Sequence, residues 1–100
     1  MPRRWRQRRG QRGRQPKPIT VDNMPPLTEF TPVPHSDSPP IVLDPTELEA
    51  LRLVDLKGLS QEEAGTRMGV SRGTVWRLLQ QARAKVAQAL SEARPITINK

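Results

Sequence analysis

Apolar side chains recur at helical spacing only in the second half of this chain. From residue 44 to residue 92 they return every three or four positions, in three successive stretches. This spacing places one apolar stripe along a helix, so the pattern predicts three amphipathic helices. Residues 19–43 instead carry short apolar runs between prolines, which favour extended backbone and turns. The chain is therefore predicted to be mainly α, with one small three-helix domain over residues 44–94.

Capping residues mark where each predicted helix begins. Asp44 is a strong N-cap, and Pro45 suits the first helical position. Ser60 begins a Ser-x-x-Glu capping box, and Ser71 is a third N-cap candidate. Gly58 and Gly69 are placed to end the first two helices. The apolar stripes of the three helices consist of Leu48, Leu51, Val54 and Leu56; of Ala64 and Met68; and of Val75, Leu78, Leu79, Ala82, Val86, Ala89 and Leu90.

The Pro-rich segment of residues 19–43 is predicted to be extended and to drape over the helices. This packing would bury Phe30 and Met24. Pro95 prevents the third helix from continuing, so residues 95–100 are predicted to form a second extended tail. The β-like triplet at residues 96–98 could pair with one of the short apolar runs of the Pro-rich segment.

Positive charge is concentrated at the start of the chain. Residues 1–18 hold eight of the 17 lysines and arginines and no acid, whereas the rest of the chain is nearly neutral. This low-complexity tail lacks the apolar surface that offsets ordering entropy, so it is predicted to be disordered. A basic block of this kind is typical of segments that bind polyanions.

Other classes of chemistry are excluded by composition. The chain has no cysteine, so a disulfide framework and a cysteine-based zinc site are both excluded. His35 is the lone histidine, and no pair of carboxylates suggests a catalytic pocket. We therefore expect neither an enzyme nor a metal or cofactor. No apolar run is long enough to span a membrane, and the expected location is the cytoplasm, in association with the nucleoid.

The second and third predicted helices have the features of a helix-turn-helix. Gly65 supplies a small residue where the two helices cross, and Gly69 supplies a turn residue four positions later. Val70, Val75 and Leu78 supply apolar anchors. In a helix-turn-helix the second helix lies in the major groove of DNA.

The outward face of the third helix carries no acid before Glu92. The residues expected to contact bases are Arg72, Gly73, Trp76 and Arg77. Either arginine could bond guanine O6 and N7, which discriminates by about 1–3 kcal/mol per pair. Trp76 could lie against a thymine methyl or a sugar, and it could equally cover the core or form a dimer contact.

Phosphate contacts are expected around this face and along the tail. Around the face they are Ser60, Gln61, Arg67, Ser71, Thr74, Arg83 and Lys85; Arg83 and Lys85 could instead be simply solvated. The expected tail contacts are Arg3, Arg4, Arg6, Arg8, Arg9, Arg12, Arg14 and Lys17. The tail could follow the DNA backbone, enter the minor groove, or act only as a solubilising segment. Trp5 could stack on an unpaired base.

Two stretches resemble a family of short bacterial and archaeal proteins that are predicted to bind DNA. They are VDNMPPLTEFTPV and ELEALRLVDLKGLSQEEAGTRMGVSRGTVWRLLQQARAKVAQAL, within a resemblance that covers about residues 2–98. Residues 44–90 are also similar to region four of sigma factors, which reads the −35 promoter element. This resemblance implies a helical fold without a wing, with Arg72, Gly73, Trp76 and Arg77 at base-reading positions. Gly65 stands where alanine is usual, and cysteines of many relatives are missing near Asp22.

The function predicted from these features is a DNA-binding transcriptional regulator that acts on duplex DNA. One alternative is an RNA-binding or ribosome-associated protein, because Arg/Gly/Gln tails suit RNA. Another is an adaptor that contacts RNA polymerase through its acidic first helix, which carries Asp44, Glu47, Glu49 and Asp55. A homodimer is a further hypothesis, because the third helix has apolar residues that one small domain would leave partly uncovered.

Overall fold

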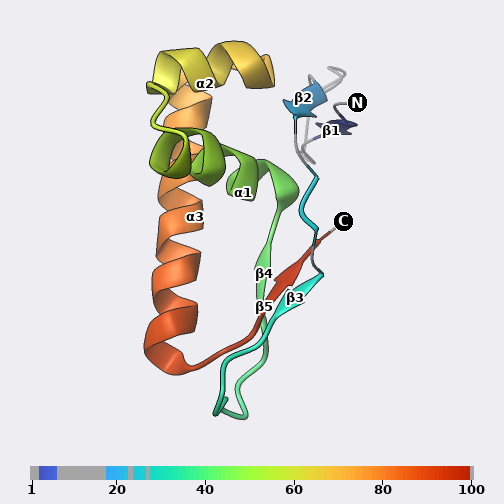
Figure 1. The fold of residues 1–100 in the computed structure, drawn as a ribbon, viewed down its shortest axis with the longest axis vertical. Coiled ribbons are helices and arrows are strands. Elements are labelled where there is room, and N and C mark those ends of the chain that lie inside the picture. Colours follow the sequence, from blue (N-terminus) through green and yellow to red (C-terminus); the bar gives the residue numbers. More distant parts are fainter. Residues whose placement is uncertain (1–2, 7–17, 23, 27, 100) are drawn as a thin grey trace, which may run out of the picture.

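The computed structural model describes residues 3–6, 18–22, 24–26 and 28–99, which form three helices, a strand pair and a small sheet (Figure 1). The short π-helical turn η1 continues α1 directly. In chain order, the elements are β1 (Arg3–Arg6), β2 (Pro18–Val21), β3 (Glu29–Phe30), β4 (Ile41–Leu43), α1 (Pro45–Leu51), η1 (Arg52–Leu56), α2 (Gln61–Met68), α3 (Arg72–Glu92) and β5 (Ile96–Ile98).

All three predicted helix starts are confirmed. At α1 the backbone N–H of Asp44 donates to Glu47 Oε1 at 2.9 Å. At α2 the bonds are reciprocal, because Ser60 Oγ accepts from the Glu63 N–H at 3.0 Å and Glu63 Oε1 accepts from the Ser60 N–H at 2.9 Å. Ser71 caps α3 through its hydroxyl oxygen. Each cap satisfies backbone donors that a helix start leaves without a partner.

The turn between α2 and α3 depends on two glycines. Gly69 has φ +70°, a left-handed conformation that favours glycine. Gly65 is buried in α2, and a Cβ atom there would lie 2.7 Å from the carbonyl oxygen of Val70. The same turn is closed by the Val70 N–H, which donates to the Gly65 carbonyl at 2.9 Å. The helix propensity that alanine would add at Gly65 is therefore opposed by a close backbone contact.

The main core lies between the three helices, and the Pro-rich segment contributes to it. Ile19 of β2 is buried among helix residues, and Val21 is fully buried beside it. A second, smaller cluster joins α3 to the sheet through Leu43, Ala82 and Ile98. The members of the main cluster are Ile19, Ala50, Leu53, Ala64, Met68, Val75, Leu78 and Leu79.

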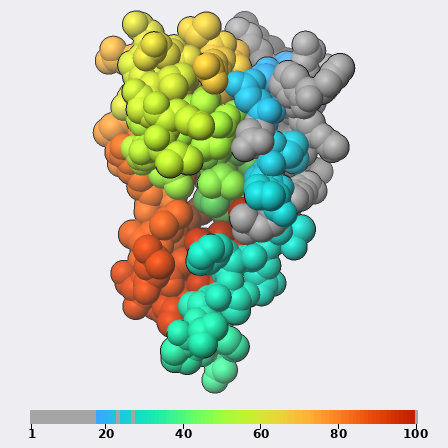
Figure 2. Space-filling model, viewed as in Figure 1, coloured from blue at the N-terminus to red at the C-terminus, as the bar shows by residue number. Residues whose placement is uncertain are grey.

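The predicted pairing of residues 96–98 with the Pro-rich segment is confirmed. β5 is the middle strand of the sheet, which has the order β3-β5-β4. It runs antiparallel to β3 and parallel to β4. Figure 2 shows the Pro-rich segment running along one side of the helices from the level of α2 down to the sheet. The extended segment therefore forms one body with the helices.

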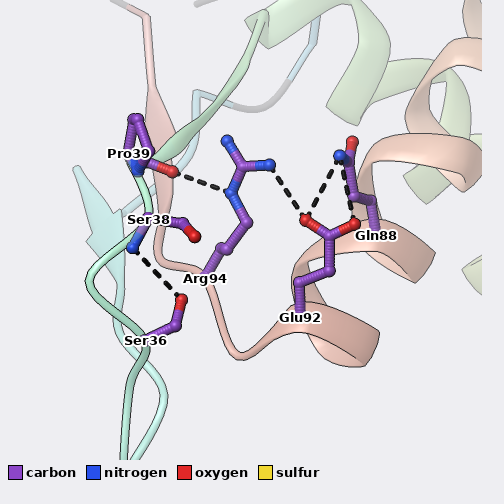
Figure 3. Close-up of polar contacts among 6 residues, drawn as sticks. All are labelled: Ser36, Ser38, Pro39, Gln88, Glu92 and Arg94. Atoms are coloured by element: carbon purple, nitrogen blue, oxygen red, sulfur yellow. Dashed lines mark hydrogen bonds and ion pairs between the residues drawn. The ribbon is translucent and has the colours of Figure 1, made fainter.

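The end of α3 is fastened to the loop between β3 and β4 (Figure 3). Arg94 Nε donates to the carbonyl oxygen of Pro39 at 2.8 Å, and Arg94 Nη1 lies 3.0 Å from Glu92 Oε1. The Ser36 N–H also donates to the Ala93 carbonyl at 2.8 Å. These bonds direct the chain out of the helix and into β5.

Two positions that were predicted to be buried, Phe30 and Leu56, are exposed instead. Phe30 is 62% exposed because β3 is a short edge strand in a sheet too small to cover both of its faces. Leu56 is 74% exposed, since the wider π turn of η1 changes the angular spacing and rotates it away from the core. Leu90 is 75% exposed, in agreement with the expectation that the third helix keeps some apolar surface uncovered, and Ala82 and Ala89 form the buried stripe at that end of α3.

The basic tail differs in part from its predicted disorder. Residues 3–6 form β1, which pairs antiparallel with β2. The prediction for residues 7–17 lies outside the described residues.

Candidate nucleic-acid interface

The first turns of α3 bring the four expected base contacts together on one surface. Arg72, Gly73 and Trp76 are exposed, Arg77 is half-buried, and Trp76 keeps 52% of its surface in solvent. Positions 72, 73, 76 and 77 share one side of a helix, because residues three or four apart are neighbours on its surface. The structure thus places these four positions on one side of α3.

The orientation of this surface follows from the residues between its members. Val75, Leu78 and Leu79 are almost completely buried in the main core. Their burial fixes the rotation of α3 and turns Trp76 away from the centre of the molecule. This exposed position disfavours the role of covering the core that the sequence left open for Trp76.

The charge of this surface is positive. No acid precedes Glu92 within α3. Among the described residues, no carboxylate lies within ion-pair distance of Arg72. The nearest acids in sequence are in the first turn of α2, where Glu63 is held by its cap. The hydrogen bond from the Ser60 N–H lowers the pKa of Glu63.

Two hydroxyls sit at the start of α3, where the helix dipole favours anions. Ser71 Oγ accepts from the Thr74 N–H at 3.2 Å and lies 3.1 Å from Thr74 Oγ1. Because one hydroxyl proton serves the contact between the two oxygens, the other proton remains able to donate to a phosphate. Either hydroxyl, but not both at once, can therefore donate to a phosphate.

The other expected phosphate contacts near the turn are spread along α2. Gln61 lies in the first turn of α2, directly after Ser60. Arg67 is exposed, and its Nη1 lies 3.9 Å from Asp22 Oδ2, a long ion pair that solvent screens. Its guanidinium has further donors for a phosphate.

Arg83 and Lys85 have acidic partners on α1 and η1. Arg83 bonds both carboxylate oxygens of Asp55, at 2.7 and 3.0 Å. Lys85 Nζ lies 2.7 Å from Glu47 Oε1, and Glu47 is buried. The bond from Arg83 lowers the pKa of Asp55. A phosphate would have to replace these carboxylates, so the phosphate contacts of Arg83 and Lys85 stay predictions.

Sequence reasoning missed the role of a buried carboxylate in α1. Glu49 is 1% exposed and accepts bonds from Arg52 Nε at 2.9 Å and Arg52 Nη2 at 3.0 Å. It also accepts the backbone N–H of Asp22 at 2.8 Å, which ties the Pro-rich segment to α1. The carboxylate raises the pKa of Arg52. The i, i+3 spacing of Glu49 and Arg52 was a local signal for this pair.

The basic tail is described only in part. Arg3, Arg4 and Arg6 belong to β1. The expected contacts Arg8, Arg9, Arg12, Arg14 and Lys17 lie outside the described residues. Within the described part of the chain, no group of three or more acidic, histidine or cysteine side chains is arranged to hold a metal ion. No helix there is long and apolar enough to cross a membrane.

Comparison with known proteins finds relatives in archaea and in bacteria. It is 52% identical over 90 residues to a UPF0251 protein of Pyrococcus furiosus, covering 87% of this chain and 83% of the relative. A UPF0251 protein of Archaeoglobus fulgidus is 41% identical over 97 residues, covering 97% of this chain and 91% of the relative. The match to the Pyrococcus horikoshii protein is 65% identical over 60 residues, and it spans only 54% of that relative.

No solved structure gives a significant match to the chain. The family described as "Protein of unknown function DUF134" matches residues 1–100 in full. This chain therefore belongs to the DUF134 family, whose relatives named above are UPF0251 proteins.

Proposed function

We propose that this protein is a sequence-specific, DNA-binding transcriptional regulator in which α2 and α3 form a helix-turn-helix. The observation that carries the proposal is the surface formed by Arg72, Gly73, Trp76 and Arg77. It is exposed or half-buried, carries no acid, and lies at the capped start of α3, directly after a tight turn. The N-terminal residues of a recognition helix are those that reach base edges.

Each member of this surface has a distinct role in the proposed complex. Arg72 and Arg77 bond the major-groove edge of guanine, which offers the paired acceptors O6 and N7. Gly73 has no side chain, so the helix backbone approaches the base edges closely at that point. Trp76 supplies apolar contact to a thymine methyl or a sugar. Ser71 and Thr74 hold a phosphate at the start of the helix and thereby set its register.

The similarity of residues 44–90 to region four of sigma factors supports the same proposal at the level of fold. In that analogy α3 takes the place of the helix that reads the −35 element. Fold-level analogy does not assign a target sequence, so the operator has to come from experiment.

The alternative of docking to RNA polymerase through an acidic first helix is less well supported. Glu47 and Glu49 are buried and already bonded to Lys85 and Arg52. Asp55 is bonded to Arg83. Little of the expected acidic face is therefore open to a partner.

The test is selection from random duplexes with the full chain, followed by the same selection with Arg72→Ala and with Arg77→Ala. We expect an enriched motif, and we expect each variant to lose preference at its own base pairs while binding other sequences about as before. No enriched motif, or uniform weakening by both variants, would refute direct reading by α3. Titration of duplex DNA, single strands and structured RNA at one salt concentration then tests the RNA alternative.

A further inference from the structure

The N-terminal strand β2 is built into the helical body. Ile19 and Val21 are buried, and Ile19 belongs to the same core cluster as Met68 and Val75. Directly after β2, the Asp22 N–H donates to Glu49 Oε2 at 2.8 Å. Apolar packing and this bond to a buried carboxylate together fix the position of β2.

β2 lies beside the turn that joins α2 to α3. A Cβ atom at Gly69 would be 4.0 Å from Thr20 Oγ1, which is ordinary contact distance. Arg67, in the last turn of α2, pairs with Asp22 at 3.9 Å. Figure 1 shows the two strands β1 and β2 at the same end of the molecule as α2.

β1 carries three arginines in four residues and pairs with β2 along its length. The register sets Arg4 opposite Thr20 and Arg6 opposite the exposed Pro18. Neighbouring strands lie about 4.8 Å apart, so the backbone of the arginine-rich strand is about one strand spacing from Thr20. The strand is therefore held near the turn that precedes α3.

We propose that β1 and β2 form a fixed second contact that binds phosphates of the same duplex, beside the site read by α3. This proposal rests on the proposed function. A duplex carries one negative charge per about 1.7 Å of its axis, so phosphates are present wherever such a strand meets it. Because β2 is anchored next to the turn, the contacted phosphates lie on one side of the motif, at constant distance from it.

This fixed contact differs from a generic basic tail in a measurable way. A tail that moves over the surface raises affinity for all DNA and contacts no particular phosphate. A strand fixed in register contacts the same phosphates in every complex. The logarithm of the binding constant falls linearly with the logarithm of the salt concentration, and loss of either kind of contact makes this slope shallower by about 0.9 per phosphate. The position of the contacts is therefore the discriminating observation.

Ethylation interference on a duplex carrying the selected motif measures that position. The full chain is compared with the triple variant Arg3→Gln/Arg4→Gln/Arg6→Gln and with the charge-matched control Arg8→Gln/Arg9→Gln/Arg12→Gln. We expect interference at a few phosphates on one flank of the motif in the wild-type complex. These signals should vanish in the first variant and persist in the control, although both variants bind DNA more weakly.

Three results are distinguishable. An enriched motif with no flanking interference, or equal loss of the flanking signals in both variants, overturns the fixed contact and leaves the reading by α3 intact. Absence of any enriched motif refutes the proposed function and with it this inference. Selective loss in the first variant supports both.

The anchor provides a second measurement. Glu49→Gln weakens the bonds that hold Asp22 and Arg52, and circular dichroism shows whether the helices remain. In a folded variant we expect weaker flanking interference with the motif contacts unchanged; unchanged flanking interference would overturn the role given to this anchor. If the variant unfolds, the two arginine triples decide the question alone.

Discussion

The two halves of α3 have similar compositions and different surroundings. Arg72 in the first half has no acidic partner among the described residues, whereas Arg83 and Lys85 in the second half bond Asp55 and Glu47. Both halves look basic and polar in the sequence. The difference teaches that positive charge along a helix identifies a binding surface only after the internal ion pairs are known.

The halves also differ in what holds them in place. The first half packs through Val75, Leu78 and Leu79 against α1, α2 and β2. The second half is joined to the sheet through Ala82 and to α1 and η1 by its ion pairs. The first half is thus held mainly by apolar contacts of Val75, Leu78 and Leu79, and Arg72 and Trp76 lie exposed on its outer side.

The largest effect is expected where the first half of α3 depends on α2. In Gly65→Leu the new side chain meets the Val70 carbonyl, since even a Cβ atom would lie 2.7 Å from its oxygen. We expect the free energy of unfolding to fall by about 3 kcal/mol or more. Urea denaturation followed by circular dichroism measures the loss.

The matched glycine control is Gly58→Leu. Gly58 has φ +75°, but no atom outside its neighbours lies within 4 Å of a Cβ there. Substitution there should lower the free energy of unfolding by about 1–2 kcal/mol, because a residue with a Cβ atom is strained in the left-handed conformation. Equal losses in the two variants would show that the close approach at Gly65 is unimportant.

The central comparison is tested by Arg72→Ala beside Arg83→Ala. On the selected duplex, Arg72→Ala should lose about 1–3 kcal/mol of discrimination between the preferred and the altered base pair. Arg83→Ala should keep the discrimination of the wild type. Fluorescence anisotropy titrations on both duplexes give the values, and comparable loss of discrimination in Arg83→Ala would erase the distinction between the two halves of the helix.

A smaller effect is expected from Lys85→Ala. The change leaves the buried Glu47 carboxylate without its 2.7 Å partner, although the Asp44 N–H still donates to it. Since Lys85 itself is one-third exposed, we expect a loss of about 1–2 kcal/mol in unfolding free energy. The midpoint temperature of thermal unfolding should fall by several degrees for a domain of this size. The double variant Lys85→Met/Glu47→Met should recover part of the lost unfolding free energy.

The smallest effect concerns acid stability. Arg83 holds the pKa of Asp55 below its ordinary value of 3.8. A carboxyl whose pKa is lower in the folded state than in the unfolded state stabilises the folded protein at pH values above the unfolded-state pKa. This contribution is lost as the pH falls through the folded-state pKa. The wild type should therefore lose stability more steeply than Arg83→Ala between about pH 5 and pH 2. Identical slopes in urea denaturation would contradict the pairing.

The local features of the fold were predictable from the sequence. The caps at Asp44, Ser60 and Ser71 form hydrogen bonds with residues three positions further along the chain. A short stretch of sequence is therefore enough to recognise them. The outward position of Trp76 followed from the spacing of the apolar stripe. The turn at Gly69 followed from the freedom of glycine to adopt positive φ.

Apart from the pairing of residues 96–98 with the Pro-rich segment, features that join distant residues were not predictable in this way. The pairs Arg83–Asp55 and Lys85–Glu47 link positions 28 and 38 residues apart. The burial of Ile19 depends on contacts with side chains of all three helices, which come together only when the helices have packed. Leu56 was misplaced because a π turn alters helical spacing, and its sequence carries no local signal of that change.

The strand order β3-β5-β4 has a consequence for biosynthesis. β3 and β4 are not hydrogen-bonded to each other in the sheet. Each pairs with β5, which follows α3 in the chain. Until residues 96–98 have been translated, the two outer strands have no partner in this sheet. The sheet can therefore close only after β5 has been translated, however early the residues of β3 and β4 are made.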